Sequence, residues 1–148
     1  MIEPTLLAWC AGIVDGEGTI QLKQTTANNT SRTWTPCLQV SMCHEITIRK
    51  FHQILKKGKV YPKGARFAHW RDEFVFLSHG EEAVANIKAI QPYLVTKAAQ
   101  AILVLEYHEK CMSQKYGNGN KIPVAMQALR EVLMEELHEL NKRGRKEG

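Results

Sequence analysis

The sequence predicts an α+β fold in which helices cover an antiparallel sheet. Short segments alternate apolar with polar side chains at a period of two, as half-exposed strands do. The stretches between and after them space their apolar residues three or four apart, which indicates helices. With 148 residues, 44% hydrophobic side chains and no internal repeat, the chain is expected to form one domain, residues 1–148, with a sizeable core.

A helix and a hairpin are predicted first. A proline near the start suits the first turn of a helix, and Gly16 and Gly18 are expected to end that helix. Residues 19–25 and 33–42 then alternate apolar and polar side chains on either side of a polar turn. We expect these two segments to pair as strands with one exposed face, on which Cys37 would lie.

A second helix and hairpin follow. Residues 48–55 have helical spacing, and Gly58 is expected to close that helix. Residues 60–62 are predicted to be a brief strand, and residues 70–76 alternate again, with Val75 among the exposed positions. The pattern therefore predicts a second hairpin after the second helix.

The rest of the chain is predicted to be mainly helical. Ser78 and Glu81 have the spacing of a capping box at the start of one helix, and Thr96 is expected to cap the next. After a predicted loop, Pro123 opens a last amphipathic helix that turns Val132 and several leucines toward the core. Residues 142–148 are expected to form a basic, flexible tail.

The charge of the chain favours a polyanionic partner. Twenty Lys and Arg residues against fifteen Asp and Glu residues give a formal charge of +5. A basic surface of this kind attracts nucleic acid, although a basic domain with no such partner has the same composition.

The cysteines and apolar runs indicate a reducing compartment and no membrane span. The four cysteines contain no CxxC pair, and no secretory or other targeting segment is visible. The apolar run 101–105 is far shorter than the roughly 20 residues that a spanning helix needs. We expect reduced thiols in a bacterial cytoplasm, or in an organelle matrix or stroma.

Residues 10–18, CAGIVDGEG, end the first predicted helix and contain two acids. Ala8, Ala11 and Gly12 lack bulk, so the backbones of two such helices can approach closely, while the glycines beside Glu17 permit a tight turn that directs this acid outward. An ordinary core helix with a glycine-rich end, whose acids are merely solvated, has the same residue types.

This segment closely resembles the signature of the LAGLIDADG homing endonucleases, and the predicted element order is also that of the family. The resemblance implies an αββαββα domain with additional C-terminal helices, in which paired signature helices each place an acid at the cleavage site. It implies metal ligands at Glu17 and Gly16, with Mg²⁺ or Mn²⁺ as cofactor and Ca²⁺ bound without efficient cleavage. It also implies a dimer interface that contains Ala8, Ala11, Gly12 and Asp15.

Residues 91–97, QPYLVTK, resemble the family segment that carries an active-site lysine, which by this match is Lys97. A surface lysine in a first helical turn is the alternative, but there it would oppose the helix dipole, a cost that phosphate binding would offset. Where single-motif relatives often place a glutamine and a basic residue near the attacking water, this chain has Met42, which donates no hydrogen bond. His44 and Arg49 are the remaining candidates for peripheral catalytic roles, with solvated loop residues as the alternative.

The polar faces of the two hairpins are predicted to read DNA, since a two-stranded ribbon fits the major groove. Half-exposed sheets alternate in this way whatever they bind, so only the position of the face between Glu17 and Lys97 makes it a binding surface. Arg32 and Arg66, at turn tips, are expected to contact phosphate. The predicted set also contains Gln21, Lys23, Thr25, Thr33, Thr35, Gln39, Tyr61, Lys63, Arg71 and Glu73.

One signature supplies one metal-binding acid, so cutting both strands of double-stranded DNA requires a homodimer and a pseudo-palindromic site. The resemblance therefore implies a site-specific DNA endonuclease that acts in homing, such as intron homing, and leaves open an intron, an intein or a free-standing gene as its origin. An RNA-binding intron maturase and a DNA-binding regulator without chemistry are the alternatives. The sequence has no zinc cluster, phosphate-cradling loop or nucleophilic Ser or Cys signature that would indicate another enzyme class.

Overall fold

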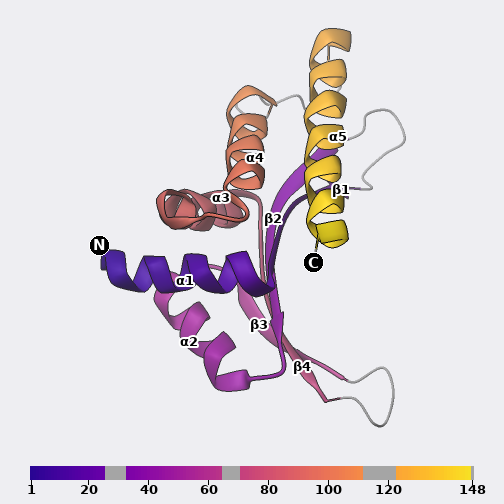
Figure 1. Cartoon of the computed structure of the whole chain (residues 1–148). Coiled ribbons are helices and arrows are strands. Elements are labelled where there is room, and N and C mark those ends of the chain that lie inside the picture. Colours follow the sequence, from indigo (N-terminus) through magenta and orange to yellow (C-terminus); the bar gives the residue numbers. More distant parts are fainter. Residues whose placement is uncertain (26–32, 65–70, 112–122, 148) are drawn as a thin grey trace.

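The computed structural model describes the chain except residues 26–32, 65–70, 112–122 and 148, and except the side chains of residues 25, 33 and 143–147 (Figure 1). In chain order the elements are α1 (Pro4–Glu17), β1 (Gly18–Thr25), β2 (Thr33–Met42), α2 (Glu45–Leu55), β3 (Lys59–Lys63), β4 (Glu73–His79), α3 (Gly80–Ile90), the 3-10 helix η1 (Gln91–Tyr93), α4 (Ala98–Cys111) and α5 (Val124–Glu147). The predicted order of helices and strands is confirmed.

The four strands form one antiparallel sheet in the order β1-β2-β4-β3, so the two predicted hairpins join through β2 and β4. Two prolines fit this topology. Pro62 lies in the edge strand β3, and Pro36 lies in β2 opposite Leu22, before the stretch of β2 that pairs with β4. The ladder between β2 and β4 therefore does not need the N–H donor that both prolines lack.

The register gives the sheet two different faces. Even-numbered positions of the strands lie on the face that the helices cover, and Ile20, Leu38 and Phe76 on this face are fully buried. Odd-numbered positions point to the opposite face. The predicted alternation is therefore confirmed, and every strand residue expected to read DNA has an odd number.

Two residues on this odd-numbered face are buried, contrary to the prediction. Cys37 is 0% exposed and Val75 is 1% exposed. Both are small side chains near the middle of the sheet, where larger neighbours cover them: the register places Cys37 opposite Gln21, and Val75 opposite Tyr61. Alternation predicts the face on which a residue lies, but not how far its neighbours cover it.

Of the glycines expected to end helices, Gly18 is confirmed as the C-cap of α1, whereas Gly16 and Gly58 are not the residues that end their helices. Gly16 does not end α1, which continues through it to Glu17. Gly18 is the residue that the turn requires, because a Cβ there would lie 2.8 Å from the Cα of Val14. The left-handed residue that closes α2 is Lys56, with φ of 67°, and not Gly58.

The predicted caps of α3 and α4 differ from the structure for a common reason. Ser78 is still in β4, where its buried hydroxyl accepts a hydrogen bond from Asn86 (3.2 Å), so it forms no capping box. Lys97, rather than Thr96, provides the first helical carbonyl of α4, which accepts from Ala101 N–H (3.0 Å). In both places tertiary contacts, which local spacing does not contain, decide where the helix begins.

The long helix α5 packs on α4 and on the β1–β2 end of the sheet (Figure 1). Leu133 and Leu137 enter the core as predicted, whereas Val132 is 52% exposed, contrary to the prediction. The helix continues to Glu147, through most of the segment predicted as a tail. Within the described residues, none of the helices combines the length and apolar character that crossing a bilayer requires.

Candidate active site and nucleic-acid surface

One side chain ties the last turn of α1 to the segment between η1 and α4. The carboxylate of Asp15 accepts hydrogen bonds from Val95 N–H through Oδ2 (2.9 Å) and from Lys97 N–H through Oδ1 (2.9 Å). Its negative charge therefore lies at the N-terminal end of α4, where the helix dipole is positive and N–H groups lack helical partners. Asp15, which the resemblance places in the dimer interface, is thus engaged within its own chain.

The half-buried Lys97 returns this contact. Its ammonium donates a hydrogen bond from Nζ to the backbone carbonyl of Asp15 at 2.7 Å. That carbonyl belongs to the C-terminal turn of α1, where helix carbonyls lack partners and the dipole is negative. The sequence position of Lys97 suggested opposition to the dipole of α4, but its charge lies at the favourable end of α1.

Glu17 is the last residue of α1 and its side chain is exposed. It lies two residues after Asp15, whose carbonyl Lys97 binds, so an acidic residue and an ammonium group belong to the same helix end. The neighbouring Gly16 leaves this end open, because a Cβ there would meet no atom within 4 Å. The arrangement provides an accessible carboxylate beside a fixed positive charge.

His44 and Arg49 make their described contacts within α2. His44 is the N-cap of this helix: its Nδ1 accepts from Thr47 N–H (3.3 Å) and hydrogen bonds with the Thr47 hydroxyl (2.7 Å). Arg49 forms an exposed ion pair with Glu45 at 3.0 Å. These contacts explain both residues as parts of α2 and supply no link between them and Glu17.

The outer face of α1 contains small residues in its middle. Ala8 and Gly12 are exposed, and a Cβ at Gly12 would meet no atom within 4 Å. Ala11, in contrast, is 0% exposed and faces the core of its own chain. Of the small residues assigned to a dimer interface, Ala8 and Gly12 are thus accessible to a second molecule. Trp9, the neighbour of Ala8 in the sequence, is much larger, and the ammonium nitrogen of Lys50 lies 5.4 Å from the centroid of its ring.

The odd-numbered face of the sheet is the candidate nucleic-acid surface. The described positions that were predicted to read DNA and that the register places here are Gln21, Lys23, Thr35, Gln39, Tyr61, Lys63 and Glu73. The backbone positions of Thr25 and Thr33 pair at the end of the same ladder. Arg71 is exposed but precedes β4, so the ladder does not place it, and Arg32 and Arg66 lie outside the described residues.

Four further polar residues belong to this face and were missed, among them Thr19, which pairs with Gln39. Lys59 begins β3 on the same side as Tyr61, Ser41 lies on the same side of β2, and His79 ends β4 opposite Cys37. The lysine could have been found by continuing the alternation of residues 61 and 63 backward by one step. His79 lies beyond residues 70–76, the segment in which the alternation predicts the last strand, because β4 runs from Glu73 to His79.

The thiols near these sites are neutral. Burial raises the pKa of Cys37 on the sheet, although the hydrogen bond from Gln21 (3.8 Å) lowers it in part. Burial also raises the pKa of Cys10 in α1 to about 11. Because the thiolate is the nucleophilic form, neither cysteine is suited to covalent catalysis. All four cysteines are free in the structure.

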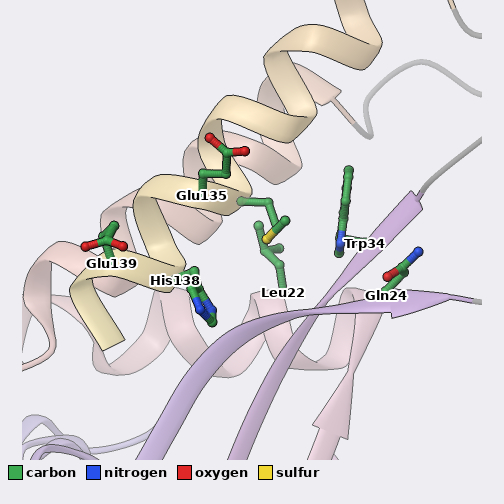
Figure 2. Close-up of a pocket in the computed structure, with 7 residues that line it drawn as sticks. Leu22, Gln24, Trp34, Glu135, His138 and Glu139 are labelled. Atoms are coloured by element: carbon green, nitrogen blue, oxygen red, sulfur yellow. The ribbon is translucent and has the colours of Figure 1, made fainter. Parts of the chain in front are cut away.

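A pocket of about 460 Å³ lies on the other face of the sheet, between the β1–β2 end and α5 (Figure 2). Leu22 and Trp34 form its apolar part. Two carboxylates, of Glu135 and Glu139, belong to its lining and would repel a phosphate backbone. The remaining lining residues are Gln24, Met134 and His138. The helix-covered face is therefore the less suitable one for DNA.

No protein-family model and no curated protein matches the chain by sequence. Several solved structures have the same fold. The archaeal intron-encoded homing endonuclease I-Vdi141I, complexed with DNA, superposes with a TM-score of 0.72 at 13% identity, over 90% of this chain and 82% of that one. The homing endonuclease I-CvuI, in complex with its target in the presence of 2 mM Ca, gives 0.71 at 22% identity, over 90% and 80%. The LAGLIDADG homing endonuclease I-GzeII, in complex with its DNA target, gives 0.63 at 14% identity, over 95% of this chain and 44% of that one.

Proposed function

We propose that this chain, which has the fold of the LAGLIDADG homing endonucleases, is a site-specific endonuclease that hydrolyses both strands of double-stranded DNA with the help of a divalent metal ion. The observation that carries the proposal is the end of α1. There Glu17, whose side chain is exposed, lies two residues after Asp15, whose backbone carbonyl accepts a hydrogen bond from the ammonium of Lys97. A metal-binding acid beside a fixed cation suits phosphodiester hydrolysis.

The donor chemistry of this helix end fits a hard cation such as Mg²⁺ or Mn²⁺. The carboxylate of Glu17 and the backbone carbonyl of Gly16 are oxygen ligands of the kind such ions prefer. Among the described residues there is no cluster of three or more His, Cys, Asp or Glu side chains that could hold a metal ion. One chain thus offers part of a coordination shell, and DNA phosphate, water and a second chain would provide the rest.

The roles of the residues follow from their charges. When bound, a divalent ion neutralises phosphate charge and lowers the pKa of water. Glu17 would hold it at the helix end, and the ammonium of Lys97 would stabilise the negative charge that develops on the phosphate. I-CvuI was crystallised with DNA in the presence of Ca in one structure and of Mg in another, and in the Mg structure the DNA was not cleaved. For this chain we propose Mg²⁺-dependent cleavage and Ca²⁺-supported binding without efficient cleavage.

The active assembly would be a homodimer. One chain has one such helix end, and the small outer face formed by Ala8 and Gly12 permits close approach of a second α1. Twofold symmetry would place two sheets along one duplex, each reading about 10 bp of a pseudo-palindromic site. Lys23, Lys59 and Lys63 give each sheet face positive charge for this purpose.

A cleavage assay on a randomised duplex pool tests the function. Purified protein is incubated with the pool in Mg²⁺, in Ca²⁺ and in chelator, and the fragments are sequenced. We expect double-strand breaks at one pseudo-palindromic sequence in Mg²⁺ only. Specific binding of duplex without breaks in Mg²⁺ or Mn²⁺ would instead identify a DNA-binding regulator, and preferential binding of structured RNA would identify a maturase.

A further inference from the structure

We infer that Asp15 is a positioning residue that fixes Lys97 against the end of α1, so that Lys97 and Glu17 act as one unit. The inference rests on the proposed function for its catalytic consequence, but the contacts that carry it can be tested without any cleavage. It gives a role to the first acid of the segment 10–18, whose carboxylate makes its described contacts within the chain.

The contact between Asp15 and Lys97 is reciprocal. The side chain of Asp15 accepts from the backbone N–H of Lys97 (2.9 Å), and the side chain of Lys97 donates to the backbone carbonyl of Asp15 (2.7 Å). Asp15 thus caps the start of α4, which Lys97 immediately precedes, and Lys97 caps the end of α1, to which Asp15 belongs. The exchange resembles that between the two partners of a capping box within one helix. The additional bond from Val95 N–H prevents the segment before α4 from rotating about a single contact.

The two charges are each placed favourably. A carboxylate at the N-terminal end of α4 and an ammonium at the C-terminal end of α1 both complement the dipole of the helix that they touch. Losing the carboxylate would therefore weaken both contacts, because the backbone of Lys97 would no longer be fixed and its long side chain would recover rotational freedom.

Fixing the ammonium has a catalytic consequence beyond stability. Groups that stabilise a transition state contribute most when they need not reorganise during the reaction. A lysine anchored at its backbone by Asp15 and at its ammonium by the helix end that carries Glu17 meets this condition. A lysine anchored only by its place immediately before α4 would not.

The first experiment measures the contact itself by amide hydrogen exchange on the full chain. In Asp15→Asn we expect exchange of the Val95 and Lys97 amides to accelerate about tenfold or more, because both bonds end on a charged acceptor. Glu82→Gln is the matched control, since Glu82 accepts from the distant Gly58 N–H (3.1 Å) and has no described contact with this site. Unchanged exchange of both amides in Asp15→Asn would overturn the inference.

The second experiment is a double-mutant cycle of single-turnover cleavage. We expect Asp15→Asn to lower the cleavage rate about 10- to 100-fold with unchanged DNA affinity in Ca²⁺, a range found for residues that orient reacting groups. In a Lys97→Met background the same substitution should change the rate less than about twofold, because it acts through Lys97. Losses that multiply in the double variant would show a structural role for Asp15 and overturn the inference.

A third variant, with a conservative substitution, distinguishes loss of the carboxylate from misfolding of the chain. Asp15→Glu keeps the charge at the end of α4 and should recover part of the exchange protection and part of the rate. Exchange and cleavage as poor as in Asp15→Asn would contradict a role for the carboxylate. If the wild-type chain cuts no duplex at all, the proposed function fails, whereas the exchange experiment still decides whether Asp15 fixes Lys97.

Discussion

The end of α1 and the odd-numbered face of the sheet carry the two halves of the proposed function in different ways. At the helix end, three hydrogen bonds of 2.7 to 2.9 Å hold Asp15, Val95 and Lys97 together. The residues that they join are 80 or 82 positions apart in the sequence. On the sheet, the register alone sets the direction of many side chains that are half or fully exposed. The first region depends on a few fixed groups and the second on the sum of many adaptable ones.

This difference predicts how each region responds to substitution. A change at the helix end should remove chemistry and leave DNA binding intact, because few groups there contact the duplex. A change on the sheet should alter affinity or sequence preference and leave the rate on the best site intact.

Glu17→Gln should have the largest effect. The amide keeps the size of the side chain but loses the charge that binds a cation beside phosphate, so cleavage should fall by orders of magnitude. DNA affinity in the absence of metal should hold or rise, because each dimer loses two repelling carboxylates. Single-turnover cleavage in Mg²⁺ and binding in chelator measure the two effects.

The matched control for this variant is Glu3→Gln at the other end of α1, where the side chain of Glu3 forms no capping hydrogen bond. It should cleave normally. Full cleavage by Glu17→Gln would contradict the proposed role of this acid, and joint loss of binding and cleavage would show that Glu17 is structural.

Lys97→Met should have the next largest effect. Losing the positive charge should lower the cleavage rate about 100-fold, as loss of one preorganised donor to a transition-state charge does. Metal-supported DNA binding should survive. Because the ammonium also caps the C-terminal end of α1, the free energy of unfolding should fall by about 0.3 to 1 kcal/mol.

Chemical denaturation and single-turnover kinetics test both consequences of Lys97→Met. Lys88→Met, which removes a lysine from the last turn of α3, is the control for loss of a helix-end charge away from the site. If Lys97→Met lost stability but kept the wild-type cleavage rate, Lys97 would be a cap and nothing more.

Gly12→Leu should weaken the dimer without harming the folded chain. Nothing lies within 4 Å of a Cβ at this position, and leucine favours helix more than glycine does, so the monomer should be as stable or slightly more stable. Overpacking between two α1 helices should cost the dimer roughly 1 to 3 kcal/mol. Sedimentation across a concentration series measures the shift.

Ala11→Leu separates the two faces of α1. Ala11 is fully buried within its own chain, so the larger side chain should lower the melting temperature of the chain itself. A wild-type chain that sediments as a monomer with and without DNA would rule out the dimer, whatever the behaviour of these variants.

The sheet face could be predicted largely from the sequence, because strand side chains alternate with a fixed period and the polar positions share one parity. Errors arose where neighbours decide exposure. Cys37 and Val75 have exposed-face parity and are nevertheless buried. Strand limits were also displaced, so Arg71 was assigned to a strand that begins at Glu73.

The residues at the helix end could be named from the sequence, but their connections could not. Glu17 and Lys97 follow from local segments, 10–18 and 91–97, that resemble family motifs. The carboxylate of Asp15 binds amides 80 and 82 residues away, and no local spacing encodes such a tertiary cap. For the same reason Thr96 was predicted as the cap of α4, although the charge that performs this role comes from α1.

The smallest expected effects come from substituting two cationic residues of the DNA-reading side, Lys23 and Arg71. They compare a residue that the strand ladder fixes with one that it does not. Lys23 lies in the β1 ladder opposite Thr35, so its direction on the odd-numbered face is fixed, and we expect it to contact base edges. Arg71 precedes β4 and is not fixed by the ladder, so we expect it to contact phosphate rather than bases.

In a binding-site selection, Lys23→Ala should relax preference at one or two base pairs of each half-site. Arg71→Ala should weaken all sequences alike and reduce the salt dependence of binding by about one charge per chain. If Arg71→Ala relaxed the sequence preference instead, Arg71 would contact bases in the DNA-bound chain, as the predicted strand 70–76 implies. If both variants kept the wild-type preference, the odd-numbered face would not be the surface that reads sequence.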